Sequence, residues 1–176
     1  MAVKSIMLIA TLTLSSCGYH LAGHGDLVPK SIHSVCIPAF KNATSRYKLS
    51  DRLPEAISRE FIARTKYTIS TDTNTCDAIL RGAVINYLAF QTTVDATPGS
   101  PGLGRATAAD IHVILNIAFM DRATGKVLYS NTNFDARERY EISVDPIAYF
   151  EESDAGLNRV ALQVARQVVS GILNAF

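Results

Sequence analysis

The amino-acid sequence predicts an α/β fold of the α+β kind, a four-stranded, mostly antiparallel or mixed sheet with two helices packed on one face. Three observations support this prediction. Two segments show apolar residues at helical spacing, one near residue 50 and one after residue 146. Three long β-rich runs separate these segments, and a short β-rich run precedes the first of them. A single sheet in this order can bury the apolar stripes of both helices.

The first strand and the first helix are predicted over residues 34–40 and 50–65. Pro38 has no N–H to donate to a ladder, so the first strand should end there or lie at an edge. The helix presents an apolar face built by Leu53, Ile57 and Phe61. Because proline is tolerated only near a first turn, Pro54 places the start of this helix between Ser50 and Pro54.

Three long strands are predicted over residues 78–94, 110–120 and 127–142. The first is apolar at most positions, as expected of a strand that is covered on both faces, and Gly82 within it indicates a bulge or a close approach. The second alternates strictly, with Ile111, Val113, Leu115, Ile117 and Phe119 on one side. Residues 121–126 form the hairpin turn that leads to the third strand.

Two segments complete the domain. Residues 95–109 hold two prolines and three glycines, which predicts a long mobile loop that interrupts the sheet. Asp145 and Pro146 are a plausible cap and first position for a C-terminal helix. The apolar stripe of that helix carries Leu157, Val160, Ala161, Val164, Val168 and Ile172, so we expect it to pack on the sheet.

Residues 1–16 are predicted to be a lipoprotein signal peptide. Lys4 provides a positive start, and the apolar run that follows is about half the roughly 20 residues a spanning helix needs. Leu14-Ser15-Ser16 then precedes Cys17, an order typical of a lipobox, whose cysteine receives a diacylglycerol. Because stable anchoring needs more than one acyl chain, a fully acylated Cys17 would hold the chain on a membrane.

Cleavage before Cys17 leaves residues 17–30 as a lipidated tether and residues 31–176 as a single domain. Without Lys4 the mature chain has 16 basic and 16 acidic residues, so no overall positive field favours nucleic acid. Gly18 stands after the cysteine, where lipoproteins kept at the inner membrane often carry Asp. The outer membrane is therefore the expected location, with the domain on its periplasmic side.

Cys36 and Cys76 are the two other cysteines, and two interpretations of them stay open. They form a disulfide if their strands are neighbours, since the Cα atoms must come within about 7 Å. Otherwise they are two small buried side chains, as free cysteines often are.

The segment Cys17-Gly18-Tyr19-His20-Leu21, directly after the lipobox, resembles the start of the lipopolysaccharide-assembly lipoproteins, the LptE family. The mature length and the predicted order of elements are also similar to that family. Ala22 departs from the arginine that many members carry at this position. The resemblance implies a protein that sits inside the outer-membrane β-barrel LptD as a plug and folding partner and contacts lipopolysaccharide.

The resemblance directs attention to residues that would meet phosphate or a barrel wall. Exposed cations pair with phosphate, and the candidates for binding lipopolysaccharide are Arg105 in the long loop with Arg122 and Lys126 in the hairpin turn. The candidates for contact with the barrel are apolar and aromatic side chains that the core does not need: Leu103, Tyr149 and Phe150.

No pattern in the sequence indicates an enzyme, a cofactor site or a metal site. The alternative to a barrel partner is an outer-membrane lipoprotein that activates or scaffolds a periplasmic cell-wall synthase. Such a protein needs a long tether, whereas residues 18–31 reach at most roughly 50 Å even when fully extended. The short tether favours a partner in the same membrane.

Overall fold

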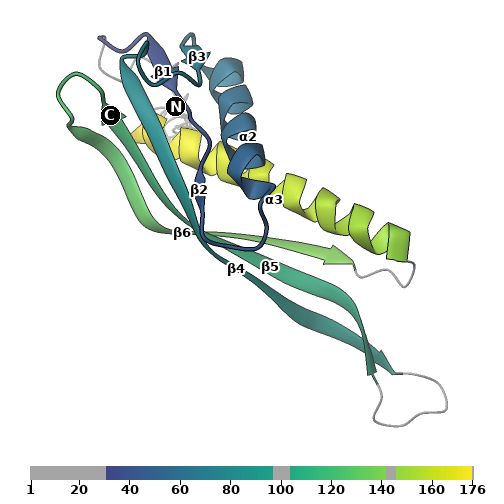
Figure 1. The fold of residues 1–176 in the computed structure, drawn as a ribbon. Coiled ribbons are helices and arrows are strands. Elements are labelled where there is room, and N and C mark those ends of the chain that lie inside the picture. Colours follow the sequence, from purple (N-terminus) through teal and green to yellow (C-terminus); the bar gives the residue numbers. More distant parts are fainter. Residues whose placement is uncertain (1–30, 97–103, 142–145, 176) are drawn as a thin grey trace, which may run out of the picture.

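The computed structural model describes residues 31–96, 104–141 and 146–175 and shows a mixed sheet with two helices on one face (Figure 1). The strands run in the spatial order β3-β1-β4-β5-β6, and β2 also pairs with β4. Pairing is parallel among β3, β1, β2 and β4 and antiparallel along β4-β5-β6. The elements are β1 (Ser34–Cys36), β2 (Lys41–Asn42), α2 (Leu49–Arg64), β3 (Thr68–Ser70), β4 (Ala78–Ala96), β5 (Gly104–Asp121), β6 (Val127–Glu141) and α3 (Pro146–Asn174).

This architecture confirms the predicted fold class, although the sheet has more than the four strands predicted. The predicted first strand, residues 34–40, is divided: β1 ends at Cys36, and the chain joins the sheet again as β2. Pro38 lies between the two strands, so the expected end of the strand near this proline is confirmed. The short strand β3 is the other addition, and it pairs with β1 from the sheet edge.

Helix α2 begins at Leu49, one residue before the predicted range, and contains Pro54 in its second turn. Because proline has no N–H, the carbonyl of Ser50, four residues earlier, has no helical donor. The backbone N–H of Phe40 donates to that carbonyl instead, at 2.9 Å. The proline therefore leaves an acceptor by which the β1–β2 connection is fastened to the helix.

The predicted loop over residues 95–109 is wrong at both of its ends. Strand β4 continues to Ala96 and β5 begins at Gly104, with Asp95 paired to Arg105 and Ala96 to Gly104. The prolines at positions 98 and 101 fall in the connecting segment, which lies outside the described residues. Residues 104–109 are mostly glycine or residues with small side chains. Their backbone is nevertheless extended, because hydrogen bonds to the long partner strand satisfy its N–H and C=O groups.

The main core lies between the sheet and the two helices. It is built by Leu53, Ile57 and Phe61 of α2, by the alternating side chains of β5, and by the apolar stripe of α3. A second, small cluster lies apart from this core and contains Cys36, Cys76 and Ile79, with Met120 packed against them. Strand alternation explains the division, because Val35 and Ile37 enter the main core while Cys36 between them does not.

The expectation that residues 78–94 are covered on both faces is wrong for their second half. Ile85, Leu88 and Phe90 expose 46%, 36% and 51% of their surface. Strands β1 and β2 accompany β4 only as far as Val84. Figure 1 shows β4 and β5 continuing beyond this point as a narrow arm. Leu88 and Phe90 remain exposed because they lie on the sheet face away from the helices, where Phe90 meets His112.

Gly82 allows a close approach, as its position in the sequence indicated. A Cβ atom at this residue would overlap the ring of Phe40, which is itself buried in the core. We predict that Gly82→Ala lowers the free energy of unfolding by about 1–3 kcal/mol, because the ring must leave its place in the core. Urea unfolding followed by circular dichroism measures the change.

Gly156→Ala is the matched control, since the new Cβ would meet Tyr140 at an ordinary 3.4 Å. Gly156 lies within helix α3, where alanine is favoured over glycine by about 1 kcal/mol. The control variant should be as stable as the parent or more so. Equal stability of Gly82→Ala and the parent would contradict the contact with Phe40.

Candidate interaction surface

The three cations predicted to bind phosphate lie at opposite ends of strand β5. Arg105 is the second residue of this strand and pairs with Asp95 of β4. Arg122 and Lys126 belong to the turn that follows Asp121, the last residue of the strand. At about 3.3 Å per residue, Arg105 is roughly 50 Å from the turn. The three residues therefore form two separate positive positions and not one patch.

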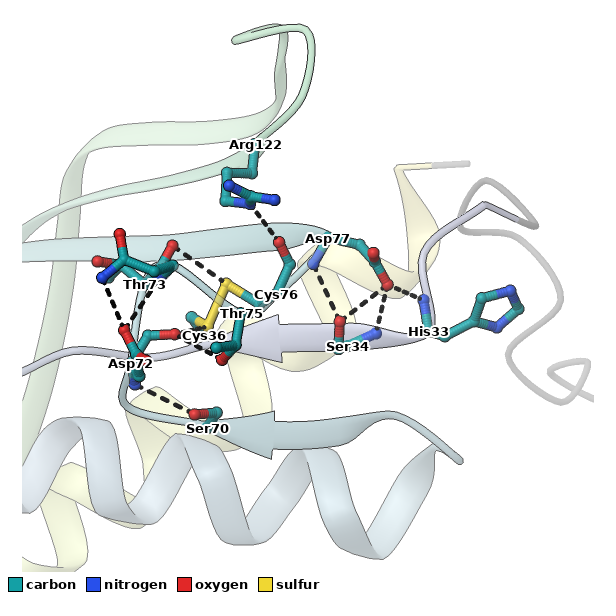
Figure 2. The surroundings of a disulfide bond; sticks show 11 residues. His33, Ser34, Cys36, Ser70, Asp72, Thr73, Thr75, Cys76, Asp77 and Arg122 are labelled. Carbon is teal, nitrogen blue, oxygen red and sulfur yellow. Dashed lines mark hydrogen bonds between the residues drawn. A yellow bond between two sulfur atoms is a disulfide. The ribbon is translucent and has the colours of Figure 1, made fainter.

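Arg122 has a structural role at the turn. Its backbone N–H donates to the carbonyl of Asp77 at 2.8 Å, and its Nε donates to the carbonyl of Cys76 (Figure 2). These contacts fasten the β5–β6 turn to the start of β4. Lys126, in the same turn, is exposed.

Cys36 and Cys76 are joined in a disulfide with their Cα atoms 5.7 Å apart, which settles the alternative that the sequence left open. Cys36 ends β1 and Cys76 stands shortly before β4, its parallel neighbour. Both side chains are buried against Ile79. The bond joins the two strands where their pairing begins (Figure 2).

The carboxylate of Asp77 lies at the same corner and holds the start of β1. Its Oδ2 accepts hydrogen bonds from the backbone N–H groups of His33 and Ser34, both at 2.9 Å, and from Ser34 Oγ at 2.8 Å (Figure 2). The bond from His33 is the largest cause that lowers the pKa of Asp77, followed by the bond from the Ser34 hydroxyl. The ionised form of Asp77 is thus part of the fold.

A group of polar and aromatic side chains lies on the sheet face opposite the helices. The ring of Phe90 meets His112 edge to face at 5.4 Å between centroids. His112 Nδ1 is 3.4 Å from Asp135 Oδ1, and Arg137 pairs with Asp135 at 2.6 Å. The hydrogen bond from Arg137 is the largest cause that lowers the pKa of Asp135.

This group and the exposed side chains of β4 form what we call the open face: Ile85, Leu88, Phe90, His112, Asp135 and Arg137. Sequence reasoning missed Leu88 and Phe90. A signal was present, because residues 86–94 are uncharged and do not show the polar alternation of a half-exposed strand. The open face is apolar along β4 and carries paired charges along β6, as a protein-binding surface does.

A shallow groove of about 380 Å³ separates the exposed sides of α2 and α3. Its charged residues are already paired, Arg52 with Asp154 at 3.0 Å and Arg59 with Glu55 at 2.7 Å. Among the described residues, no group of His, Cys, Asp or Glu side chains is arranged to hold a metal ion. No helix in this part of the chain is long and apolar enough to cross a membrane.

The remaining predicted residues are only partly placed. Cys17 and Leu103 lie outside the described residues. Tyr149 and Phe150 belong to the first turns of α3, but their side chains are also outside what the structure describes.

Comparison with known proteins finds the same fold in several solved structures. A protein from Caulobacter crescentus assigned as a lipoprotein has a TM-score of 0.54 at 14% identity, over 82% of this chain and 91% of that one. The hypothetical protein CT253 of Chlamydia trachomatis has a TM-score of 0.55 at 10% identity, over 82% and 97%. The rare lipoprotein B of Shewanella oneidensis has a TM-score of 0.50 at 12% identity, over 80% and 94%. At these identities the likeness concerns the fold alone.

No family model matches the sequence. No curated protein matches it either.

The Asp77 contacts predict a pH dependence of stability. Because the folded-state pKa is lowered, the stabilisation by the ionised carboxylate is complete above its ordinary pKa near 4 and is lost as pH falls through the folded pKa. Asp77→Asn should be less stable than the parent at pH 7, and the difference should shrink on acidification to about pH 3. Urea unfolding at both pH values measures it.

Glu141→Gln, at the exposed end of β6, is the control and should stay close to the parent at neutral pH. If the difference between Asp77→Asn and the parent is the same at both pH values, the carboxylate does not contribute in its ionised form.

Proposed function

We propose that this protein is an outer-membrane lipoprotein, anchored on the periplasmic side through Cys17, that works by binding and catalyses no reaction. The observation that carries this proposal is the open face, where large apolar side chains stand exposed on the side of the sheet away from the described helices α2 and α3. Exposed apolar patches of this kind mark surfaces that meet another macromolecule.

The membrane anchor is supported by the lipobox at residues 14–17. Two of the solved structures with the same fold are described as lipoproteins, which is consistent with a fold used at the end of a lipid anchor. A short tether keeps the domain near the membrane surface, so its partner should lie in or at that membrane.

The partner that we propose is an LptD-type β-barrel, with this protein as its plug and folding partner. The Cys-Gly-Tyr-His-Leu start supports the choice. The long, narrow shape of the β4–β5 arm supports it as well, because such an arm can lie along the wall of a barrel (Figure 1). The interior of such a barrel is mostly polar. We therefore expect Ile85, Leu88 and Phe90 to contact those parts of the barrel that are apolar.

Lipopolysaccharide is the second proposed ligand. Its phosphates would meet Arg105 at one end of the sheet, or Lys126 and Arg122 at the other. Because Arg105 lies far from Arg122 and Lys126, a single headgroup would contact only one of these two ends of the sheet. Arg122 is partly occupied by its bond to Cys76, which leaves Lys126 as the freer cation at the turn.

The barrel partnership predicts a defined complex. The full chain, expressed with its native signal and an affinity tag, should bring down an LptD-type barrel in equal amount from outer membranes solubilised in mild detergent. The double variant Leu88→Ser and Phe90→Ser should lose most of the barrel, because it removes the apolar part of the open face.

The matched control is the double variant Ile62→Ser and Leu162→Ser, which removes apolar side chains that are 62% and 44% exposed on the helices. This variant should retain the barrel. Recovery of a cell-wall synthase without any barrel would instead favour the scaffold alternative.

The lipopolysaccharide contacts predict graded losses. Alanine at Arg105, Arg122 and Lys126 together should weaken binding of purified lipopolysaccharide to the full-length protein about tenfold or more, since each charged hydrogen bond contributes about 1.5–3 kcal/mol. Arg105→Ala alone, compared with the Arg122→Ala and Lys126→Ala pair, shows which end binds. Unchanged binding by the triple variant, with unchanged unfolding, would reject all three residues.

A further inference from the structure

The two helices have an outer side, turned away from the sheet, on which apolar side chains are exposed. Ile62 of α2 exposes 62% of its surface, and Leu162 of α3 exposes 44%. Around the helix axes, Ile62 lies about 180° from Leu53 and Leu162 about 160° from Val164. Leu53 and Val164 are buried in the core under the sheet. Ile62 and Leu162 therefore point away from the sheet.

These two side chains belong to one surface that runs across both helices. Leu162 lines the groove of about 380 Å³ between the helices together with Arg59. Ile62 follows Arg59 by one turn on the same side of α2. Beyond the groove, Arg64 of α2 donates to Ser170 Oγ of α3 at 2.6 Å, so the helices remain side by side there (Figure 1). We call this surface the helical face.

Arginine side chains flank the apolar residues of the helical face. Arg59 lies one turn before Ile62, and Arg166 lies one turn after Leu162. The apolar part of an arginine side chain can lie along apolar surface while its guanidinium stays in a polar layer. Apolar side chains with neighbouring cations are typical of helices that lie in the interface of a membrane.

The predicted lipid tether joins the domain at the same end of α2. The carbonyl of His33 accepts a hydrogen bond from the backbone N–H of Thr68 at 3.0 Å. Thr68 follows Ile62 by six residues, which span at most roughly 22 Å. Figure 1 shows this end of α2 beside β1 and β3. Ile62 therefore lies near the point from which the chain leads back to Cys17.

The length of the tether keeps the helical face within reach of the membrane. Residues 18–31 reach at most roughly 50 Å even when fully extended. A short linker gives the attached domain a high effective concentration at the surface that holds the linker. Contact through a small number of side chains is then sufficient, because the acyl chains already retain the protein.

We propose that, before the anchored chain meets a partner, its helical face lies on the phospholipid surface that holds Cys17. Ile62 and Leu162 then enter the headgroup layer. The inference rests on the lipid anchor proposed above and does not depend on which protein is the partner. In this orientation the open face points away from the membrane, because it lies on the other side of the sheet. Leu88 and Phe90 therefore remain accessible to a partner.

Charge favours a lipid surface over a second copy of the chain as the occupant. Arg59 pairs with Glu55 at 2.7 Å, and Arg64 lies 3.6 Å from Glu60. Arg166 is exposed and has no ion pair within the part of the chain that the structure describes, so it makes the surroundings of Leu162 positive. Anionic phospholipids complement this charge. A second copy would instead add the same positive charge.

Tryptophan reports the orientation directly, because the chain contains none. The acylated full chain with Ile62→Trp is placed in vesicles of phosphatidylethanolamine and phosphatidylglycerol. Its emission should shift to the blue and lose most of its intensity when the phospholipids are brominated. Leu162→Trp should behave in the same way. Leu88→Trp, at a position of the open face that is 36% exposed, is the matched control and should not be quenched.

Emission at position 62 that bromine does not quench, or equal quenching at position 88, would overturn the proposal. A blue shift at position 62 without quenching would also overturn it, since protein and not lipid would then cover the helical face. Mass spectrometry of the same sample shows whether Cys17 carries lipid. A chain without lipid would refute the anchor, whereas failed quenching of an acylated chain would refute the orientation alone.

Arg166→Gln tests the electrostatic part of the contact. In vesicles with phosphatidylglycerol it should lower the ratio of contacting to non-contacting chains about fivefold, the effect of one cation near an anionic surface. The quenched fraction of the Ile62→Trp emission measures this ratio. Arg81→Gln is the matched control, because Arg81 is exposed and follows the core residue Leu80, so it points to the other face of the sheet. It should leave the ratio unchanged.

The same comparison in vesicles of neutral phosphatidylcholine should show no difference between Arg166→Gln and the parent. An equal loss in neutral and anionic vesicles, or an equal loss for Arg81→Gln, would contradict the charge complementarity on which the choice of a lipid surface rests.

Discussion

The antiparallel pairing of β4 with β5 is the interaction on which the rest of the structure depends. It runs from Ala78 opposite Asp121 to Ala96 opposite Gly104. The other elements build on it: β1 and β2 add to one edge, β3 adds to β1, β6 adds to the other edge, and the helices cover one face. A two-stranded ribbon alone is marginal in water. The core covers one face of the ribbon as far as Ala109 of β5, whereas Leu88 and Phe90 on the other face are exposed.

At the end of the sheet opposite the β4–β5 arm, the disulfide between Cys36 and Cys76 stabilises the part that contains the short strands β1 and β3. Strands β1 and β3 have only three residues each, and their parallel pairing is non-local. The bond between Cys36 and Cys76 closes a loop with a sequence separation of 40, worth about 4 kcal/mol in the chain-entropy description. Asp77 and Arg122 add hydrogen bonds on either side of it.

Much of this fold follows from local sequence patterns. Strict alternation from Ile111 to Phe119 predicted β5, and four-residue spacing of Leu53, Ile57 and Phe61 predicted α2, because one face of each element must be buried. The pattern at residues 95–109 misled, since proline and glycine indicate a break but do not show how far two strands pair on either side of it.

The candidate surface was predicted less well because it depends on topology. Apolar residues at 85, 88 and 90 have the composition of a covered strand, and the sequence does not show that α2 and α3 both pack on the other face of the sheet. Arg105 and Arg122 are both near turns in the sequence, yet a long hairpin places them at opposite ends. The disulfide likewise required knowledge that β1 and β4 are neighbours.

The central claim is that this protein acts through the part of β4 beyond Val84 and the open face, and not through its helices. Hydrogen exchange of the full chain, alone and in complex with an LptD-type barrel, tests it most directly. We expect the amides of residues 85–96 to exchange more slowly in the complex, since the barrel would contact the exposed side chains of this part of β4, while α2 and α3 are unchanged. Slower exchange confined to α2 and α3, with residues 85–96 unaffected, would contradict the claim.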